Sequence, residues 1–262
     1  MTLAAAIIRA GLRGPLGPRF TVWGDVMEPR RYARLGVLLV SASLAVFIVT
    51  NTAFFRVQDI RVTGASRVPP HEIASLSGLS KGQHMFSFRS EDVKALVMRQ
   101  PWVLSTTVSR RFPGVVEIAV TERTPVACVP YHNGFLTVDE EARVLDFSSG
   151  GKIPYPIISG WSPASAAAGD FVQSAGILSG IRCVLGASPA MRERISELAV
   201  EKDQSILLYL AGGLRVYFGQ ADAQAQKRFN VLESVLEDIS NNKINALYVD
   251  LRYANPVIKT GK

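Results

Sequence analysis

The stretch from Leu35 to Phe55 constrains this chain more than any other feature. It runs for 21 residues without Asp, Glu, Lys, Arg, His or Pro, and a helix needs roughly 20 mostly apolar residues to cross the hydrocarbon of a bilayer. We therefore predict one transmembrane helix over residues 35–55, as an uncleaved anchor. Two alternatives stay open: a cleaved signal peptide, whose apolar region is usually shorter, and a core helix buried in a large soluble protein.

The charges before this stretch predict which way the helix points. Residues 1–34 carry six arginines against Asp25 and Glu28, and a positive excess beside a membrane segment is retained in the cytoplasm. We expect a mostly disordered cytoplasmic tail, interrupted by Gly and Pro, with residues 56–262 on the other side. Because the tail supplies +4 of the net charge of +7, the basic balance indicates topology and not nucleic-acid binding.

The segment after the predicted helix has the pattern of strand, helix, helix, strand, strand. Ile60 and Val62 alternate with charged residues, Pro70 opens a short helix, and Ser90 is a good N-cap for a second one. Two strands follow, joined at residues 112–114, and alternate apolar positions of the second predict one buried face. We expect both helices to cover one face of a three-stranded sheet, because neither is apolar all round.

Four runs in this region resemble one known family. They read FRVQDIRVTGASRV, GLSKGQHMFSF, RQPWV and VSRRFPGVVEIAVTERTPVA, all within residues 55–127. They resemble the POTRA domain of the FtsQ/DivIB bacterial cell-division proteins, and the run from Pro101 to Ala127 carries most of the specificity. The resemblance implies a POTRA domain over residues 56–124 with the order β-α-α-β-β.

The rest of the chain reads as a second unit that mixes strands and helices. A hairpin carries the acidic run 139–141 in its turn, which we interpret as a solvated loop. A helix follows with Asp170 as its predicted N-cap, and a second amphipathic helix precedes a closing strand over 247–253. Strands are also expected at 196–201, 205–210 and 214–219.

Two motifs in this second unit extend the resemblance. Residues 213–219 and 248–253 are similar to the family, in which the POTRA domain is followed by a larger β domain. The predicted fold class is α+β, with a cytoplasmic tail at 1–34, a transmembrane helix at 35–55, the POTRA domain at 56–124 and a mixed β domain at 125–262. The short stretch after the last strand favours the FtsQ branch and an inner membrane facing a periplasm.

A search for catalytic patterns finds no constellation. The chain has no HExxH and no phosphate-binding loop, and Cys128 with His132 is a lone pair where zinc needs three or four ligands. We expect no catalytic residue, metal, cofactor, nucleic acid or small-molecule substrate. A membrane-anchored cell-wall enzyme stays open as an alternative, and release of product from peptidoglycan by residues 56–262 would reveal it.

The two cysteines, Cys128 and Cys183, both lie in the part predicted to be outside the cytoplasm. A disulfide between them is chemically allowed in an oxidising compartment, although their separation in space cannot be read from sequence. The alternative is two buried thiols, because unpaired Cys commonly packs as a small hydrophobe.

The resemblance implies a scaffold of the division machinery that binds the bitopic partners FtsB and FtsL, at the septum. In the family FtsB docks on the terminal region, so the implied partner-binding residues are Arg252, Tyr253, Ala254, Asn255, Val257 and Ile258. A sheet edge there would offer unpaired backbone groups to a partner strand, although Pro256 removes one donor. The alternative for Tyr253 is a half-buried strand aromatic.

Arg110 and Arg111 form a second predicted site. They precede the turn at 112–114, and in the family the POTRA domain is tied to recruitment to the division site. A solvated turn is the alternative. A further alternative for the whole chain is a POTRA module of an outer-membrane assembly or secretion system, although such chains continue into a barrel of many strands.

Overall fold

The computed structural model describes residues 29–51, 55–151 and 153–261 and divides into two units between Thr52 and Ala53. The first unit contains helix α1 (Pro29–Asn51). From residue 32 to residue 47 its described side chains are all exposed. Pro29 stands at the start of the helix, where proline's missing N–H costs nothing.

The predicted transmembrane helix at 35–55 is not confirmed by this unit. Although α1 covers most of the range, the described residues include no helix with the length and apolar character needed to cross a membrane. Residues 52–54, near the end of the prediction, lie outside the described residues, as does the predicted tail up to residue 28. The prediction of a disordered tail was wrong for residues 29–34, which belong to α1.

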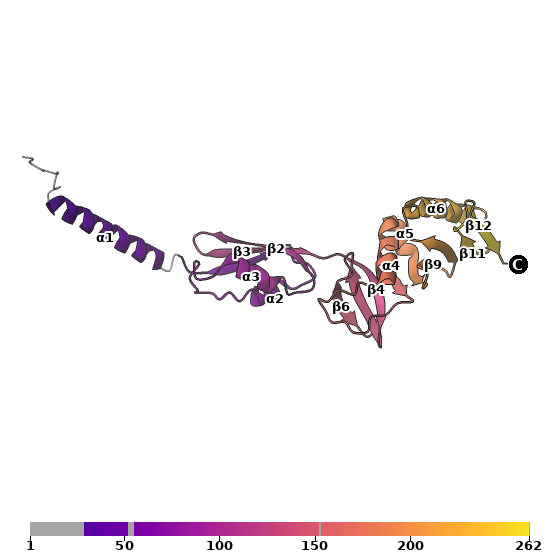
Figure 1. Cartoon of the computed structure of the whole chain (residues 1–262), viewed down its shortest axis with the longest axis horizontal. Coiled ribbons are helices and arrows are strands. Elements are labelled where there is room, and N and C mark those ends of the chain that lie inside the picture. Colours follow the sequence, from indigo (N-terminus) through magenta and orange to yellow (C-terminus); the bar gives the residue numbers. More distant parts are fainter. Residues whose placement is uncertain (1–28, 52–54, 152, 262) are drawn as a thin grey trace, which may run out of the picture. The chain divides into compact units, whose positions relative to one another are not determined.

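The second unit begins with the predicted order β-α-α-β-β. The elements are β1 (Asp59–Thr63), α2 (Pro70–Leu76), α3 (Ser90–Val97), β2 (Val103–Arg111) and β3 (Val115–Glu122). The sheet order is β1-β3-β2, with β1 parallel and β2 antiparallel to β3. The inward face of β3 forms one core with α2 and α3, whose buried members include Ile73, Val93, Val97, Val116, Ile118 and Val120. Figure 1 shows both helices beside this sheet.

Ser90 is not the N-cap of α3, as the sequence had predicted. The cap position is Arg89, and the Ser90 hydroxyl accepts a hydrogen bond from Nη1 of Arg110 at 3.0 Å. In a capping serine this oxygen would accept a backbone N–H of the first turn. Here it accepts the guanidinium of Arg110 instead.

The carboxylate of Glu122, at the end of β3, binds the loop that precedes α2. It accepts the backbone N–H groups of Ser66, Arg67 and Val68 at 3.0 Å and the Ser66 hydroxyl at 2.7 Å. Burial alone raises the pKa of Glu122, but the N–H of Val68 and the hydroxyl of Ser66 outweigh it, so the pKa lies below its ordinary value. This contribution to stability is present above pH ~4.5 and is lost as the carboxylate is protonated in acid.

The remaining strands form one mixed sheet of nine strands. They are β4 (Pro125–Tyr131), β5 (Gly134–Asp139), β6 (Val144–Ser148), β7 (Ile157–Ser159), β8 (Ile195–Val200), β9 (Ser205–Leu210), β10 (Arg215–Gln220), β11 (Ala246–Asp250) and β12 (Val257–Thr260). Their spatial order is β12-β11-β10-β9-β8-β7-β4-β5-β6. The helices are α4 (Ala175–Gly186), α5 (Pro189–Arg194) and α6 (Ala225–Asn241), drawn beside these strands in Figure 1.

The core of this sheet is built with the helical stripes that the sequence predicted. Ile177 and Ile181 of α4, and Phe229 and Leu232 of α6, are buried against inward residues of the strands. Phe229 stacks on Phe218 of β10 with ring centroids 4.5 Å apart. The α6 crossover therefore fixes β11 parallel to β10, as a βαβ connection requires.

The cap of α4 differs from the prediction. Ser174 is the N-cap, and its hydroxyl accepts the N–H of Ile177 at 3.2 Å. Asp170 instead accepts the N–H of Ala167 at 2.8 Å, which closes the preceding turn. Both residue types make such local bonds, so composition alone did not separate the two positions.

The acidic run at 139–141 is also not a simple solvated loop. Asp139 is 2% exposed and accepts Nη1 of Arg123 at 2.5 Å together with the N–H groups of Glu141 and Arg143. Burial would lower the pKa of Arg123, but its hydrogen bonds to Glu141 and Asp139 raise it, so the guanidinium stays charged. This buried ion pair joins the link after β3 to the end of β5.

Replacing Asp139 by Ala should destabilise residues 53–262 by about 1–3 kcal/mol, because it removes the buried partner of Arg123 and leaves only the more exposed Glu141 to pair with the guanidinium. Urea unfolding followed by circular dichroism measures this change. The matched control is Glu140→Ala, an exposed neighbour that should stay within about 0.5 kcal/mol. Equal stability of the two variants would contradict a structural role for the pair.

Candidate functional site

The C-terminal end of the sheet is an open edge formed by β12. Among the described strands, β12 pairs only with β11, with Asp250 opposite Val257 and Val249 opposite Ile258. The sequence had predicted one strand running on through Tyr253, and this was wrong. The chain bends at 251–256 and returns as an antiparallel strand.

The outer edge of β12 carries backbone groups directed away from the sheet. Gly261 donates its N–H to the carbonyl of Asn245 at 2.8 Å, on the β11 side. In an antiparallel strand these groups alternate in direction from one residue to the next. The N–H and C=O groups of Ile258 and Thr260 therefore point to the open side.

The bend before β12 is organised by Arg252 and Asp250. Nε and Nη2 of Arg252 donate to the two carboxylate oxygens of Asp250, at 3.0 and 2.6 Å, and the backbone N–H of Arg252 donates at 3.0 Å. The guanidinium also lies over the ring of Tyr217, 4.9 Å from its centroid, and this ring meets Tyr248 edge to face. Arg252 thus ties the bend to strands β10 and β11.

The ion pair shifts both pKa values in the direction that favours charge. The hydrogen bond from Arg252 is the main reason that the pKa of Asp250 lies below its ordinary value. The same bond raises the pKa of Arg252. Asp250 is nearly buried whereas Arg252 is about half exposed, so solvent screens part of the attraction.

The six predicted partner-binding residues fall into two groups. Tyr253 and Val257 are 65% and 49% exposed, and Ala254 and Asn255 are exposed beside them. Ile258 is half-buried and packs on the sheet core, while Arg252 is engaged with Asp250. The structure therefore brings all six to one bend and strand, but their side chains are not equally accessible.

A cavity of about 210 Å³ lies beside this bend. It is lined by Gln224, Lys227, Arg228, Val231, Leu251, Arg252, Tyr253, Ala254 and Pro256. Arg228 is held by Asp222 at 2.6 Å and by the carbonyl of Gln220. Arg228 and Arg252 are each paired with an aspartate, whereas Lys227 of α6 adds an exposed cation to the lining. Sequence analysis missed this cavity because α6 is separated from the bend along the chain.

Leu247 is a second residue that sequence analysis misplaced. In the predicted closing strand over 247–253, Leu247, Val249 and Leu251 occupy alternate positions, which would place all three on the buried face. Leu247 is nevertheless 46% exposed. The pairing of β11 with β12 shifts register between Ala246 and Tyr248. A bulge of this kind turns the intervening side chain outward.

Arg110 and Arg111, predicted to project from the hairpin for recruitment, have different environments. Arg110 is half-buried and donates to the carbonyls of Met85 and Phe88, at 2.8 and 2.6 Å, with its guanidinium over the Phe88 ring. Arg111 is exposed and pairs with Glu117. Arg110 therefore holds the loop before α3, and only Arg111 presents its charge to solvent.

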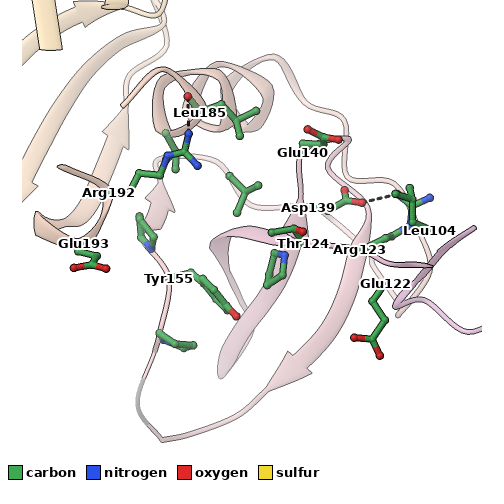
Figure 2. A pocket seen from close by; sticks show the side chains of 15 residues that line it. Leu104, Glu122, Arg123, Thr124, Asp139, Glu140, Tyr155, Leu185, Arg192 and Glu193 are labelled. Carbon is green, nitrogen blue, oxygen red and sulfur yellow. Dashed lines mark hydrogen bonds and ion pairs between the residues drawn. The ribbon is translucent and has the colours of Figure 1, made fainter. Parts of the chain in front are cut away.

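A larger cavity of about 410 Å³ lies between the link after β3 and helices α4 and α5. Figure 2 shows Arg123 directed at Asp139, and Arg192 directed at the backbone of Leu185. Tyr155 on its wall accepts a hydrogen bond from Arg67 at 3.0 Å. The lining, all within the described part of the chain, contains no His, Cys, Ser or Lys.

Both cysteines are free and buried in the structure, and no disulfide joins them. Burial raises the pKa of Cys183 to about 12 and raises that of Cys128, in the latter case against a weak contact with Thr137. His132 is exposed and meets the ring of Tyr131 edge to face. In the part of the chain that the structure describes, no group of three or more His, Cys, Asp and Glu residues has the arrangement of a metal site.

Comparison with known families covers both sheets. Residues 55–123 match the family model described as "POTRA domain, FtsQ-type", and residues 127–252 match "Cell division protein FtsQ/DivIB, C-terminal". These matches define a POTRA-bearing protein whose second sheet is of a cell-division type.

Curated relatives agree with these two matches. Proteins named "Cell division protein FtsQ" are similar over most of the chain: one from Anaeromyxobacter sp. (strain K) is 29% identical, covering 85% of this chain and 81% of that protein. One from Syntrophotalea carbinolica is 26% identical, covering 90% and 83%. One from Geotalea daltonii is 25% identical, covering 80% and 78%. The chain belongs to the FtsQ/DivIB family of bacterial cell-division proteins.

Asp250→Asn should destabilise residues 53–262 by about 1–3 kcal/mol at neutral pH, because it leaves Arg252 without its charged acceptor. The pKa of Asp250 is lowered on folding. The ion pair therefore contributes fully to the free energy of unfolding above pH ~3.8, and this contribution is lost as the pH falls through the pKa of Asp250 in the folded chain. Urea unfolding at neutral pH and near pH 3 measures the difference. If the difference in free energy of unfolding between wild type and Asp250→Asn does not shrink in acid, the assignment is contradicted. The control is Glu237→Gln, at an exposed position on α6.

The native chain should resist thiol reagents at both cysteines at neutral pH, because both are buried with raised pKa values. Labelling should become complete in urea without any reductant. Mass spectrometry of the labelled chain counts the modified thiols. A requirement for reductant before labelling in urea would show that the two thiols are bonded.

Proposed function

We propose that this chain is a non-enzymatic scaffold of the division machinery, which binds FtsB- and FtsL-type partners and thereby controls septal wall synthesis. The observation that carries the proposal is the open edge of β12, with Tyr253 and Val257 exposed beside it. It lies at and beyond the end of the region that matches the family's C-terminal model. Membership of a bacterial cell-division family supports the same role.

The proposal places the chain in the cell inner membrane, anchored by residues 35–55 with its N-terminus inside and its bulk in the periplasm. The exposed apolar side chains of α1 support this anchor, among them Val37, Leu39 and Val40 at 68–69% exposure. No charged residue interrupts the sequence from Leu35 to Phe55. A helix with apolar residues all round its surface needs an apolar environment to cover them.

Recognition at the edge of β12 proceeds through backbone pairing. A partner strand laid along β12 satisfies the outward groups of Ile258 and Thr260, and side chains beside the strand supply the specificity. Tyr253 offers a large aromatic surface at low entropy cost, as is usual for anchors in protein interfaces. The exposed cation of Lys227 in the neighbouring cavity suits an acidic residue that flanks the added strand.

Thr260→Pro tests the edge directly. It removes an outward N–H without removing a donor that pairs with β11, so affinity for the periplasmic segment of an FtsB homologue should fall about tenfold or more. Titration calorimetry with the full chain in detergent measures the affinity. Thr260→Ala, which keeps the backbone donor, should bind as wild type does, and Tyr253→Ala should weaken binding through the side chain.

Two results would overturn this assignment. Wild-type affinity in Thr260→Pro, with an unchanged circular dichroism spectrum, would exclude strand addition at β12. Absence of binding by the wild-type chain would remove the proposed partner while leaving membership of the family intact.

A further inference from the structure

Three phenylalanine rings gather at one end of the three-stranded sheet. The centroid of Phe55 lies 5.9 Å from that of Phe86 and 5.8 Å from that of Phe112, and the last two are 6.1 Å apart. Phe86 and Phe112 are 55% and 56% exposed. Neither the sheet edge of the proposed scaffold nor its cavities use these residues.

Backbone hydrogen bonds hold the three rings in place. Met85 donates its N–H to the carbonyl of Phe55 at 2.8 Å, and Gln58 donates to Gly114 in the turn that follows Phe112 at 2.7 Å. The entry to β1, the loop before α3 and the β2–β3 turn are therefore fixed to one another. The three rings therefore form a surface whose arrangement is fixed by hydrogen bonds between separate segments of the chain.

Apolar surface of this kind is unfavourable in water, and contiguous patches mark contacts with proteins or membranes. The small number of residues between α1 and Phe55 favours contact with a membrane over contact with a protein. Phe55 follows Asn51, the last residue of α1, by four residues, a path of at most about 14 Å when extended. If residues 35–55 are a membrane anchor, Phe55 is the last residue of the span, and the rings of Phe86 and Phe112 lie against it.

The charges beside the rings fit the same surface. Arg56 follows Phe55 and is exposed, with its guanidinium on the carbonyl of Gly82 at 3.0 Å. Arg111 precedes Phe112 and is exposed, paired with Glu117. Aromatic rings flanked by arginines are typical of segments that lie in the boundary between headgroups and acyl chains.

The exit from this sheet lies at its other end. Val115, which pairs with Asp59, is at the ring-bearing end of β3, and Glu122 is at the far end. They are the two ends of an eight-residue strand, about 23 Å apart at the usual rise per residue. The aromatic cluster and the link to the larger sheet therefore face opposite directions along β3.

We propose that Phe55, Phe86 and Phe112 form a membrane-contact surface, which inserts its rings into the headgroup boundary of the bilayer that holds the anchor. The inference rests on the anchoring part of the proposed function. This contact would attach the three-stranded sheet to the bilayer at a second point, in addition to its covalent connection to the anchor.

The test uses the full chain reconstituted in vesicles of phosphatidylethanolamine and phosphatidylglycerol. Phe86→Cys and Phe112→Cys are each labelled with the environment-sensitive fluorophore NBD, because the buried native thiols do not compete. Phe171→Cys is the matched control, since Phe171 is 51% exposed in the segment between β7 and α4. Lipids that carry a nitroxide should quench the first two labels about twofold or more relative to the control, because interfacial groups lie roughly 5–10 Å into the boundary.

Carbonate extraction of the same vesicles separates the two proposals. A chain that resists extraction but shows equal, weak quenching at all three positions overturns the membrane-contact surface and leaves the anchor standing. A chain that carbonate removes from the vesicles overturns the anchor, and the surface that rests on it. Protection of the labels that appears only when a partner protein is added, without lipid quenching, overturns the lipid assignment in favour of a protein contact.

Discussion

The structure of residues 55–261 depends on two consecutive charges, Glu122 and Arg123, at the point where the chain leaves the first sheet. Glu122 accepts three N–H groups of the loop before α2, and Arg123 pairs with buried Asp139 at the end of β5. One charge is neutralised by the backbone of the first sheet and the next by a side chain of the second. A shift of the link would therefore break the hydrogen bonds of Glu122 on one side and separate the buried pair of Arg123 and Asp139 on the other.

From this link the second sheet extends in two directions. Strands β4, β5 and β6 form one flank, and β7 to β12 continue to the open edge. The bidentate pair of Arg252 and Asp250 closes the bend at that edge, with Tyr217 beneath the guanidinium. The side chains at the edge are thus split between those that shape the bend and those that face solvent. A rigid bend reduces the conformational entropy that this chain would otherwise lose when a partner binds.

Much of the fold could be predicted from the sequence, where local patterns agreed with one another. The alternation of Val116, Ile118 and Val120 gave the buried face of β3, and the apolar stripes gave α4 and α6. Asp139 was misread because its partner, Arg123, lies sixteen positions earlier and no local signal links them. Leu247 was misread because a bulge interrupts the period of two on which alternation depends. The hairpin at β12 was missed since its strand has four residues, too few to show a period.

The two buried thiols have a consequence for how the chain folds in the cell. A protein whose Cys128 and Cys183 are buried and unbonded needs no oxidant to reach its native state. Its stability comes from packing and strand pairing, which are the same in reducing and oxidising surroundings. The folded chain is therefore indifferent to the redox poise of its compartment, and a failure of the oxidative folding machinery should leave its level unchanged.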